Sequence, residues 1–332
     1  MATINVQDVA KAVNTYLATN KKVVSADFGQ ALKTTLDAYA KKVTKVKGQY
    51  PQFHMILSHV VQGFRPQWDE LGKANLQSKI LKNYQQKVNF PVIPAEILNT
   101  YLADLYEEGK PITNKEIAKM IFKDVLAKIK DDVEYLSIRG EYNATNAYGQ
   151  FGYSMDGISK VIDTIYADTT HPAYKVPLNA LTDTNIVDEI TKFERKVPAY
   201  VKNKVKKIFL SENNFERYVL RYEELYGQNT DYKATSKMKT RLGKRELVAL
   251  PGLPDDKVFA TIDGNLLKLV DIIDNPPAFT DVQVQDYKIK LFAEFWLGYD
   301  FAINEAVFVS NFTDTAEGLG DPAKEALYFP HK

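Results

Sequence analysis

The chain has 332 residues, of which 45% are hydrophobic and 26% are charged, and this composition excludes overall disorder and predicts a substantial buried core. A formal net charge of +1 argues against a dedicated nucleic-acid binder and keeps self-repulsion between copies low. The absence of cysteine excludes disulfides and thiolate chemistry, and no apolar run is long enough to span a membrane.

Residues 1–50 are predicted to form a helical arm, and they lack the basic and apolar blocks of a secretory signal. Apolar residues recur at helical spacing in two groups, the second of which follows a helix-start signal at residues 25–27. The groups are Val6, Val9, Ala10, Val13 and Leu17, and then Phe28, Leu32, Leu36 and Tyr39. The arm is rich in lysine, which indicates either a solvated face or a surface that contacts DNA or a partner.

Residues 51–112 are predicted to be extended. Residues 55–64 are rich in β-forming residues, and residues 84–90 alternate until Pro91 and Pro94 end the pattern. The polar residues 69–78 lie between these segments and are expected to form the tip of a long hairpin. A long hairpin with few core residues is not stable alone, so it needs another surface to lie on.

Residues 113–150 contain the most clearly predicted helix, which Thr113 and Asn114 cap and Gly140 ends. At 3.6 residues per turn it would run about five to seven turns and act as a strut. Its apolar stripe consists of Ile117, Met120, Ile121, Val125, Ile129 and Val133. The polar residues 143–152 form a candidate domain boundary.

Residues 151–279 mix helices and short strands, which predicts an α+β fold. Helices are expected after Asp156 and Gly157, over residues 183–197, and after residues 211–214. Strands are expected over residues 207–210, 247–250, 258–262 and 266–273, and residues 227–240 are expected to form a mobile loop. No period of 20–50 residues indicates a repeat architecture.

Residues 287–309 are the most strongly patterned stretch. Apolar residues alternate over residues 287–297, which predicts a half-buried strand. Residues 298–300 are expected to break this strand before a second apolar run, so the stretch is predicted to be a strand pair. No nucleophile, metal cluster or phosphate loop lies near it, and Trp296 and Phe308 are therefore predicted to be packing residues.

No catalytic, cofactor-binding or metal-binding residue is predicted. The histidines, His54, His59, His171 and His331, lack the spacing of a metal pair and are expected to be structural or solvated. The adjacent carboxylates are expected to be solvated as well, because catalytic carboxylates need burial or a coupled partner. These pairs are Glu107 and Glu108, Asp131 and Asp132, Glu223 and Glu224, and Asp255 and Asp256.

The common catalytic and phosphate-binding motifs are absent as well, and Gly243 and Lys244 lack the upstream glycine of a phosphate loop. Two basic clusters indicate either a phosphate-contacting surface or charge pairing between neighbouring copies. They are Lys202, Lys204, Lys206 and Lys207, and then Lys237, Lys239, Arg241, Lys244 and Arg245.

Several short segments, taken in order, resemble tailed-phage major capsid proteins of the Hong Kong 97-type fold, in particular those of phages and prophages of Bacteroidetes-like hosts. Residues 87–94 (KVNFPVIP) resemble the end of the extended loop of that family. Residues 154–158 (SMDGI) and 181–187 (LTDTNIV) resemble the entry to its axial domain. Its later elements are resembled by residues 208–215 (IFLSENNF), 250–254 (LPGLP), 258–261 (VFAT), 265–267 (NLL) and 295–308 (FWLGYDFAINEAVF).

The resemblance implies an N-terminal helical arm (1–50), an extended loop (51–112), a peripheral domain with a spine helix (113–150), an axial domain (151–279), return strands of the peripheral domain (280–312) and a C-terminal tail (313–332). It implies a structural protein without enzymatic activity or cofactor that self-assembles, as hexamers and pentamers, into an icosahedral head shell enclosing double-stranded DNA. The extended loop would lie over a neighbouring subunit.

The same resemblance implies scaffold, portal and other head proteins as partners, non-specific contact with packaged DNA, and no membrane. The protein would be made in the bacterial cytoplasm and reside in the virion capsid. Two alternatives stay open: an encapsulin-like nanocompartment shell, which has the same fold, and a soluble enzyme or binding module whose site forms only in three dimensions.

Overall fold

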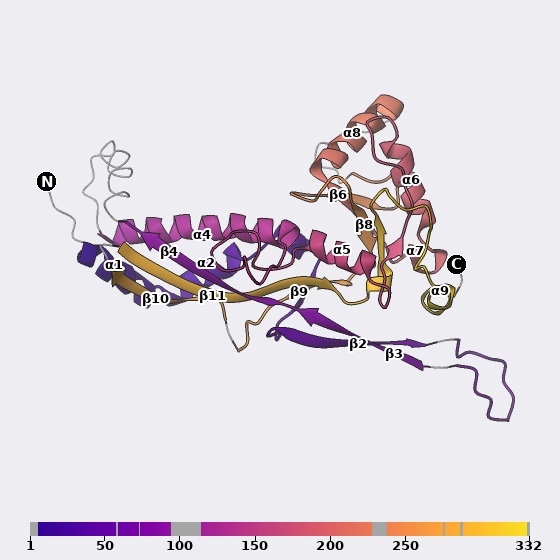
Figure 1. The fold of residues 1–332 in the computed structure, drawn as a ribbon, viewed down its shortest axis with the longest axis horizontal. Helices are drawn as coiled ribbons and strands as arrows, with labels where there is room; N and C mark the ends of the chain where they lie inside the picture. Colours follow the sequence, from indigo (N-terminus) through magenta and orange to yellow (C-terminus); the bar gives the residue numbers. More distant parts are fainter. Residues whose placement is uncertain are drawn as a thin grey trace.

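The computed structural model describes residues 6–57, 59–72, 74–93, 114–227, 238–274, 276–285 and 288–330. The chain forms an elongated body from which a two-stranded hairpin projects (Figure 1). In the described part, the body contains two five-stranded sheets, and buried apolar residues gather in one large cluster at each sheet. The α+β class predicted from the sequence is confirmed.

The first sheet is built around one long strand, β11. This strand pairs with β10 and β4 along its first part and with β9 along its last four residues, and β9 also pairs with β1. The strands are β1 (Lys41–Val43), β4 (Tyr84–Val92), β9 (Leu266–Leu269), β10 (Ala278–Gln285) and β11 (Lys288–Phe301). Side chains of β11 alternate between buried and more exposed positions over residues 289–297, as the sequence predicts.

Helix α4 (Asn114–Arg139) runs along the first sheet (Figure 1). Five of the six residues of the predicted apolar stripe, Ile117, Ile121, Val125, Ile129 and Val133, are buried in the core of this sheet, and Met120 is partly buried. The helix ends at Arg139, directly before Gly140, as predicted. A Cβ on Gly140 would lie 2.5 Å from the carbonyl oxygen of Met155. The chain therefore passes too close at this point for any side chain.

The N-terminal segment packs on the first sheet. Helix α1 (Val6–Thr19) contacts α4, and helix α2 (Lys21–Ala31) places Phe28 against Phe295 of β11, with ring centroids 5.9 Å apart. The second helix begins before the predicted start at residues 25–27 and ends at Ala31; residues 35–38 form a separate 3-10 turn.

A polar network fastens this turn to the sheet. The Lys268 ammonium donates to Asp37 (2.7 Å) and to the carbonyl of Leu32 (2.7 Å), and the hydroxyl of Tyr299 donates to Asp37 (2.9 Å). Burial lowers the pKa of Lys268 and raises the pKa of Tyr299. These side chains come from strands β9 and β11, so the N-terminal segment is an integral part of the first sheet's unit.

The second sheet has the strand order β5-β12-β8-β6-β7. Its strands are β5 (Tyr174–Lys175), β6 (Lys207–Ser211), β7 (Glu246–Leu250), β8 (Val258–Thr261) and β12 (Val307–Ser310). The helices of this unit are α6 (Ile186–Lys196), α7 (Ala199–Lys202), α8 (Glu212–Tyr226) and α9 (Pro322–Tyr328). Ser211 caps α8 by accepting from the backbone of Asn214. Helix α5 (Ile158–Ala167) lies between α4 and the second sheet (Figure 1). Its apolar residues are buried in the core of the first sheet.

The predicted hairpin exists, but its strands differ from the prediction. Strand β2 (Gln49–Leu57) pairs with β3 (Ala74–Lys82), and residues 84–92 form β4 in the first sheet. Part of the predicted polar tip, residues 74–78, is therefore strand. The sequence misleads because β3 alternates polar and apolar residues without strong hydrophobicity, and because strand partners are set by contacts distant in sequence.

The predicted break at residues 298–300 is also wrong. Strand β11 continues to Phe301, and the second apolar run forms β12 in the other sheet. There the ring centroids of Phe308 and Tyr174 lie 5.3 Å apart. Glycine weakens a strand, but it also permits close approach of another backbone. A Cβ on Gly298 would lie 2.7 Å from the carbonyl oxygen of Lys82. Phe308 is confirmed as a packing residue, and Trp296 is partly buried.

Replacing Gly298 with alanine is expected to destabilise the protein by about 1–3 kcal/mol, because the new methyl group meets backbone atoms on both sides of the Lys82–Asn83 peptide. The matched control is Gly29→Ala in helix α2, where nothing lies within 4 Å of the added Cβ. That variant should gain about 0.5–1 kcal/mol from helix propensity. Urea denaturation measures both, and equal midpoints for Gly298→Ala and the parent chain would contradict the close contact.

Candidate functional site

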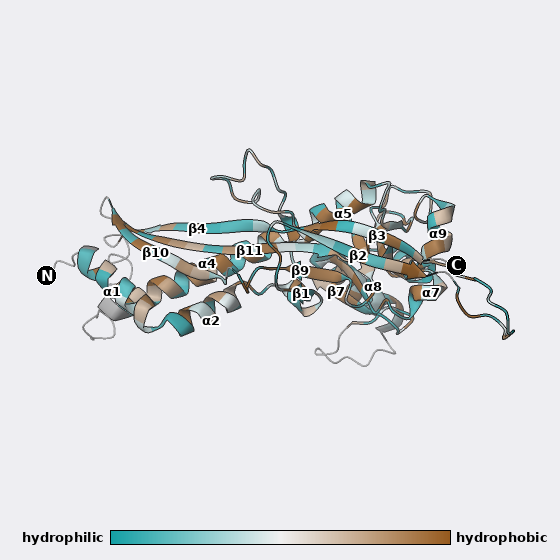
Figure 2. Cartoon of the chain, turned by 90° about the horizontal axis from the view of Figure 1, so that it is seen from below, coloured by the Kyte–Doolittle hydropathy of each residue, from teal (hydrophilic) through white to brown (hydrophobic). Residues whose placement is uncertain are grey.

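The hairpin of β2 and β3 has an apolar face that points away from its own subunit. Phe53, Met55 and Leu57 alternate along β2, and Leu76 and Ile80 do so along β3; all five side chains are more than half exposed. Met55 lies directly opposite Leu76, so the two rows form one surface. Figure 2 shows hydrophobic residues along both strands of the hairpin, which lies on the near side in that view.

The tip of the hairpin also carries exposed apolar side chains. Val61, Phe64 and Trp68 lie in the described part of the tip, and Phe64 is 96% and Trp68 92% exposed. Large exposed apolar patches of this kind mark interaction sites in folded proteins. The exposed aromatic and aliphatic side chains thus extend from the middle of the ribbon to its end.

The opposite face of the hairpin is mostly polar and lies on the body of the subunit. Gln52, His54, Gln77 and Lys79 point to this side and are partly buried, together with Ile56. The usual arrangement of a half-buried hairpin places apolar residues inward and polar residues outward. Here the polarity is reversed.

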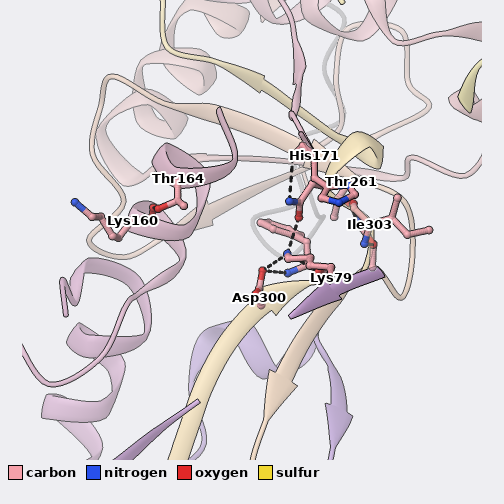
Figure 3. Close-up of polar contacts among 10 residues, drawn as sticks. Lys79, Lys160, Thr164, His171, Thr261, Asp300 and Ile303 are labelled. Atoms are coloured by element: carbon pink, nitrogen blue, oxygen red, sulfur yellow. Dashed lines mark hydrogen bonds and ion pairs between the residues drawn. The ribbon is translucent and has the colours of Figure 1, made fainter. Parts of the chain in front are cut away.

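Lys79 makes the central contact between the hairpin and the body (Figure 3). Its ammonium donates to a carboxylate oxygen of Asp300 (2.5 Å), to the carbonyl of Phe301 (2.9 Å) and to the side-chain oxygen of Asn304 (2.6 Å). These three acceptors match the three protons of an ammonium group. Burial raises the pKa of Asp300, and the positive charge of Lys79 acts in the opposite direction.

A second polar contact lies next to Lys79. Nε2 of His54 is 3.0 Å from the hydroxyl of Tyr328 in helix α9, and Nδ1 of His171 is 3.0 Å from the buried carboxylate of Glu305. Burial lowers the pKa of His54, although the charge of Glu305 acts against this shift, and burial raises the pKa of Tyr328. Side chains from the hairpin, α9 and the segment between β11 and β12 therefore meet here.

The histidines do not gather at one point. His54 and His171 lie in this network and His59 lies in the hairpin tip, while His331 is outside the described residues. Across the residues that the structure describes, no group of three His, Asp or Glu is placed to hold a metal ion.

The carboxylate pairs are dispersed over the molecule. Asp132 accepts from Lys128 and Glu224 from Arg221, whereas Asp255 accepts from Ser211 and Asn213. These hydrogen bonds, that of Ser211 first, lower the pKa of Asp255. Glu107 and Glu108 lie outside the described residues.

Charge pairs within the chain engage three residues of the two predicted basic clusters. Lys206 pairs with Asp263 (2.6 Å), Arg241 with Asp188 (3.5 Å), and Arg245 with the fully buried Glu194. The Lys207 ammonium lies over the ring of Tyr39. These contacts weaken the case for a phosphate-binding surface. In the described part of the chain, no helix is both long and apolar enough to cross a membrane.

Lowering the pH from about 7.5 to 5.5 is expected to destabilise the parent chain more than a His54→Gln variant. Burial lowers the pKa of His54 below the ordinary histidine value of about 6.5, so the folded state resists protonation of this ring. This histidine's contribution is therefore complete above pH 6.5 and declines as the pH falls below that value. Thermal melting at each pH measures the difference, and parallel pH profiles for the two chains would refute this role of His54.

No protein-family model and no curated protein sequence matches the chain. A chain from the cyanophage A-1(L) capsid asymmetric unit superposes with a TM-score of 0.53 and 14% identity, over 86% of this chain and 92% of that one. A chain from the satellite phage P4 procapsid including size determination (Sid) protein gives 0.51 and 9%, over 90% and 99%. A chain from Gordonia phage Cozz gives 0.50 and 10%, over 83% and 85%. The chain therefore shares the fold of these phage proteins, which is the Hong Kong 97-type capsid fold.

Proposed function

We propose that the chain is the major capsid protein of a tailed phage and that many copies assemble into the icosahedral head shell. The observation that carries this proposal is the reversed polarity of the hairpin, whose apolar face points away from its own subunit. The shared fold with proteins from phage particles supports the same conclusion.

A neighbouring copy is the occupant that best explains the apolar face. Burying the five large side chains would contribute about 2 kcal/mol each, or on the order of 10 kcal/mol before the cost of association. That cost is estimated at about 4–15 kcal/mol, so one hairpin contact by itself is weak. In a closed shell each subunit both gives and receives a hairpin, and repeated weak contacts then act together.

The rest of the chain fits a role in a shell. In the proposed subunit, α4 is the spine of the peripheral domain, residues 151–279 gather around the capsomer axes, and residues 280–312 return toward the peripheral domain. The partners are other copies of the chain, in hexamers and pentamers, together with scaffold, portal and other head proteins. Packaged double-stranded DNA is contacted non-specifically.

The proposed role is structural, without catalysis, and the protein is made in the host cytoplasm and resides in the virion capsid. A nanocompartment shell is the alternative with the same fold. The neighbours cited at TM-scores of 0.50 or more come from phages, which favours the phage head.

Expressed alone at high concentration, the chain is expected to form shells, sheets or capsomer rings visible by negative-stain electron microscopy. A double variant, Met55→Lys with Leu76→Lys, should abolish these assemblies and leave the melting temperature of the subunit nearly unchanged. The two residues are cross-strand partners on the exposed face, so the variant places like charges in the proposed contact without touching the subunit core.

The matched control is Met55→Leu with Leu76→Met, which retains the apolar area and should assemble like the parent chain. Capsomers count as support, because complete shells of such proteins can need a scaffold. A compact monomer that persists at high concentration would overturn the proposed function. Assembly of the double-lysine variant at the parental level would overturn the role of the hairpin face.

A further inference from the structure

Hydrogen bonds between Gly48 and Asn83 fasten the base of the hairpin, and this point is called the Gly48–Asn83 pivot below. The backbone N–H of Gly48 donates to the side chain of Asn83 (2.6 Å), and the N–H of Asn83 donates to the carbonyl of Gly48 (2.9 Å). The amide of Asn83 also donates to the carbonyl of Val46 (2.6 Å). Gly48 has a φ of +75°, which glycine adopts without strain, and Gly298 packs directly against Asn83. The two strands thus leave the body at a point defined by several short contacts.

Beyond this pivot, the hairpin adheres to its own subunit mainly through polar groups. Leu81 is fully buried beside the base, in a small cluster with Val46, Leu267 and Leu269. Farther toward the tip, Lys79 and His54 supply the contacts described above. A contact built from a charged pair and hydrogen bonds gains little net free energy, because water replaces these partners when the contact opens.

The contact also joins the hairpin to the C-terminal helix. Tyr328 contacts His54, and the next residue, Phe329, is buried in the second core. The ring centroids of Phe329 and Tyr174 lie 5.4 Å apart. The charged and titratable groups around the contact are Lys79, His54, His171, Asp300, Glu305 and Tyr328. They come from both hairpin strands, from β11, from the segment before β12, from the loop before β5 and from α9.

We propose that Lys79, with Asp300 and Asn304, forms a latch that His54 and Tyr328 complete, and that the hairpin swings about the Gly48–Asn83 pivot when this latch opens. The closed latch holds the hairpin along the body and keeps its apolar face outward. The open latch frees the ribbon to take a second orientation without unfolding the sheet to which it is attached. This device belongs to the unassembled subunit, so it can be tested whether or not the chain builds a shell.

The test measures the distance between the hairpin tip and the body by double electron–electron resonance. The chain has no native cysteine, so spin labels at Gln67→Cys and Ala180→Cys, both exposed, are the sole labels. Measurements are made below the concentration at which the chain assembles. The parent chain should give a narrow distance distribution, and Lys79→Met should give a broad one. Lys82→Met on the same strand is the control, because Lys82 lies on the exposed face.

Lys79→Met leaves Asp300 buried without its cation and can lower the stability of the fold. A second variant, Lys79→Met with Asp300→Asn, removes both charges and keeps the shape of the carboxylate. A third, Tyr328→Phe, removes the hydroxyl facing His54 and should broaden the distribution to a smaller extent. Melting curves identify the folded variants. A parental, narrow distribution in the folded variants overturns the latch, and a broad distribution in the Lys82→Met control overturns the assignment to Lys79.

Discussion

The close approach of two backbones at Gly298 and Asn83 is the constraint on which the rest of the structure depends. Strand β11 exchanges partners at this point: Leu297 pairs with Tyr84 of β4, and Gly298 pairs with Leu269 of β9. The hairpin ends at Lys82, and after Asn83 the chain enters the first sheet as β4. One contact therefore lies where β11 changes partners, where β4 begins and where the projecting hairpin has its base.

The polarity of that ribbon connects the fold to its proposed function. A hairpin with its apolar side turned inward would bury that side on its own subunit. It would then present no apolar face to a second subunit. This hairpin instead uses Lys79 and His54 to contact the body, and it leaves Phe53, Met55 and Leu76 facing solvent. The internal contact is polar and the external surface is apolar, which is the combination that favours association between copies over a stable closed monomer.

The N-terminal segment shows how tertiary contacts change the meaning of a correct local prediction. Its helical spacing predicts two helices, and both exist. The sequence pattern does not reveal that Phe28 packs on Phe295, or that Lys268 and Tyr299 hold Asp37. The predicted arm is therefore bound closely to the first sheet. Its lysines at positions 11, 21, 22 and 33 are exposed, as expected for a solvated face.

The sequence by itself determined the elements whose periodicity is local. The stripe of α4 and the alternation of β11 could be predicted because the 3.6-residue and two-residue repeats follow from backbone geometry alone. The tertiary structure decided which strands pair, that β11 continues through Gly298, and which face of the hairpin meets the body. An alternating strand has two faces, and nothing in its own residues states which one is turned inward. Contacts with residues more than 200 positions away, such as Lys79 with Asp300, make that choice.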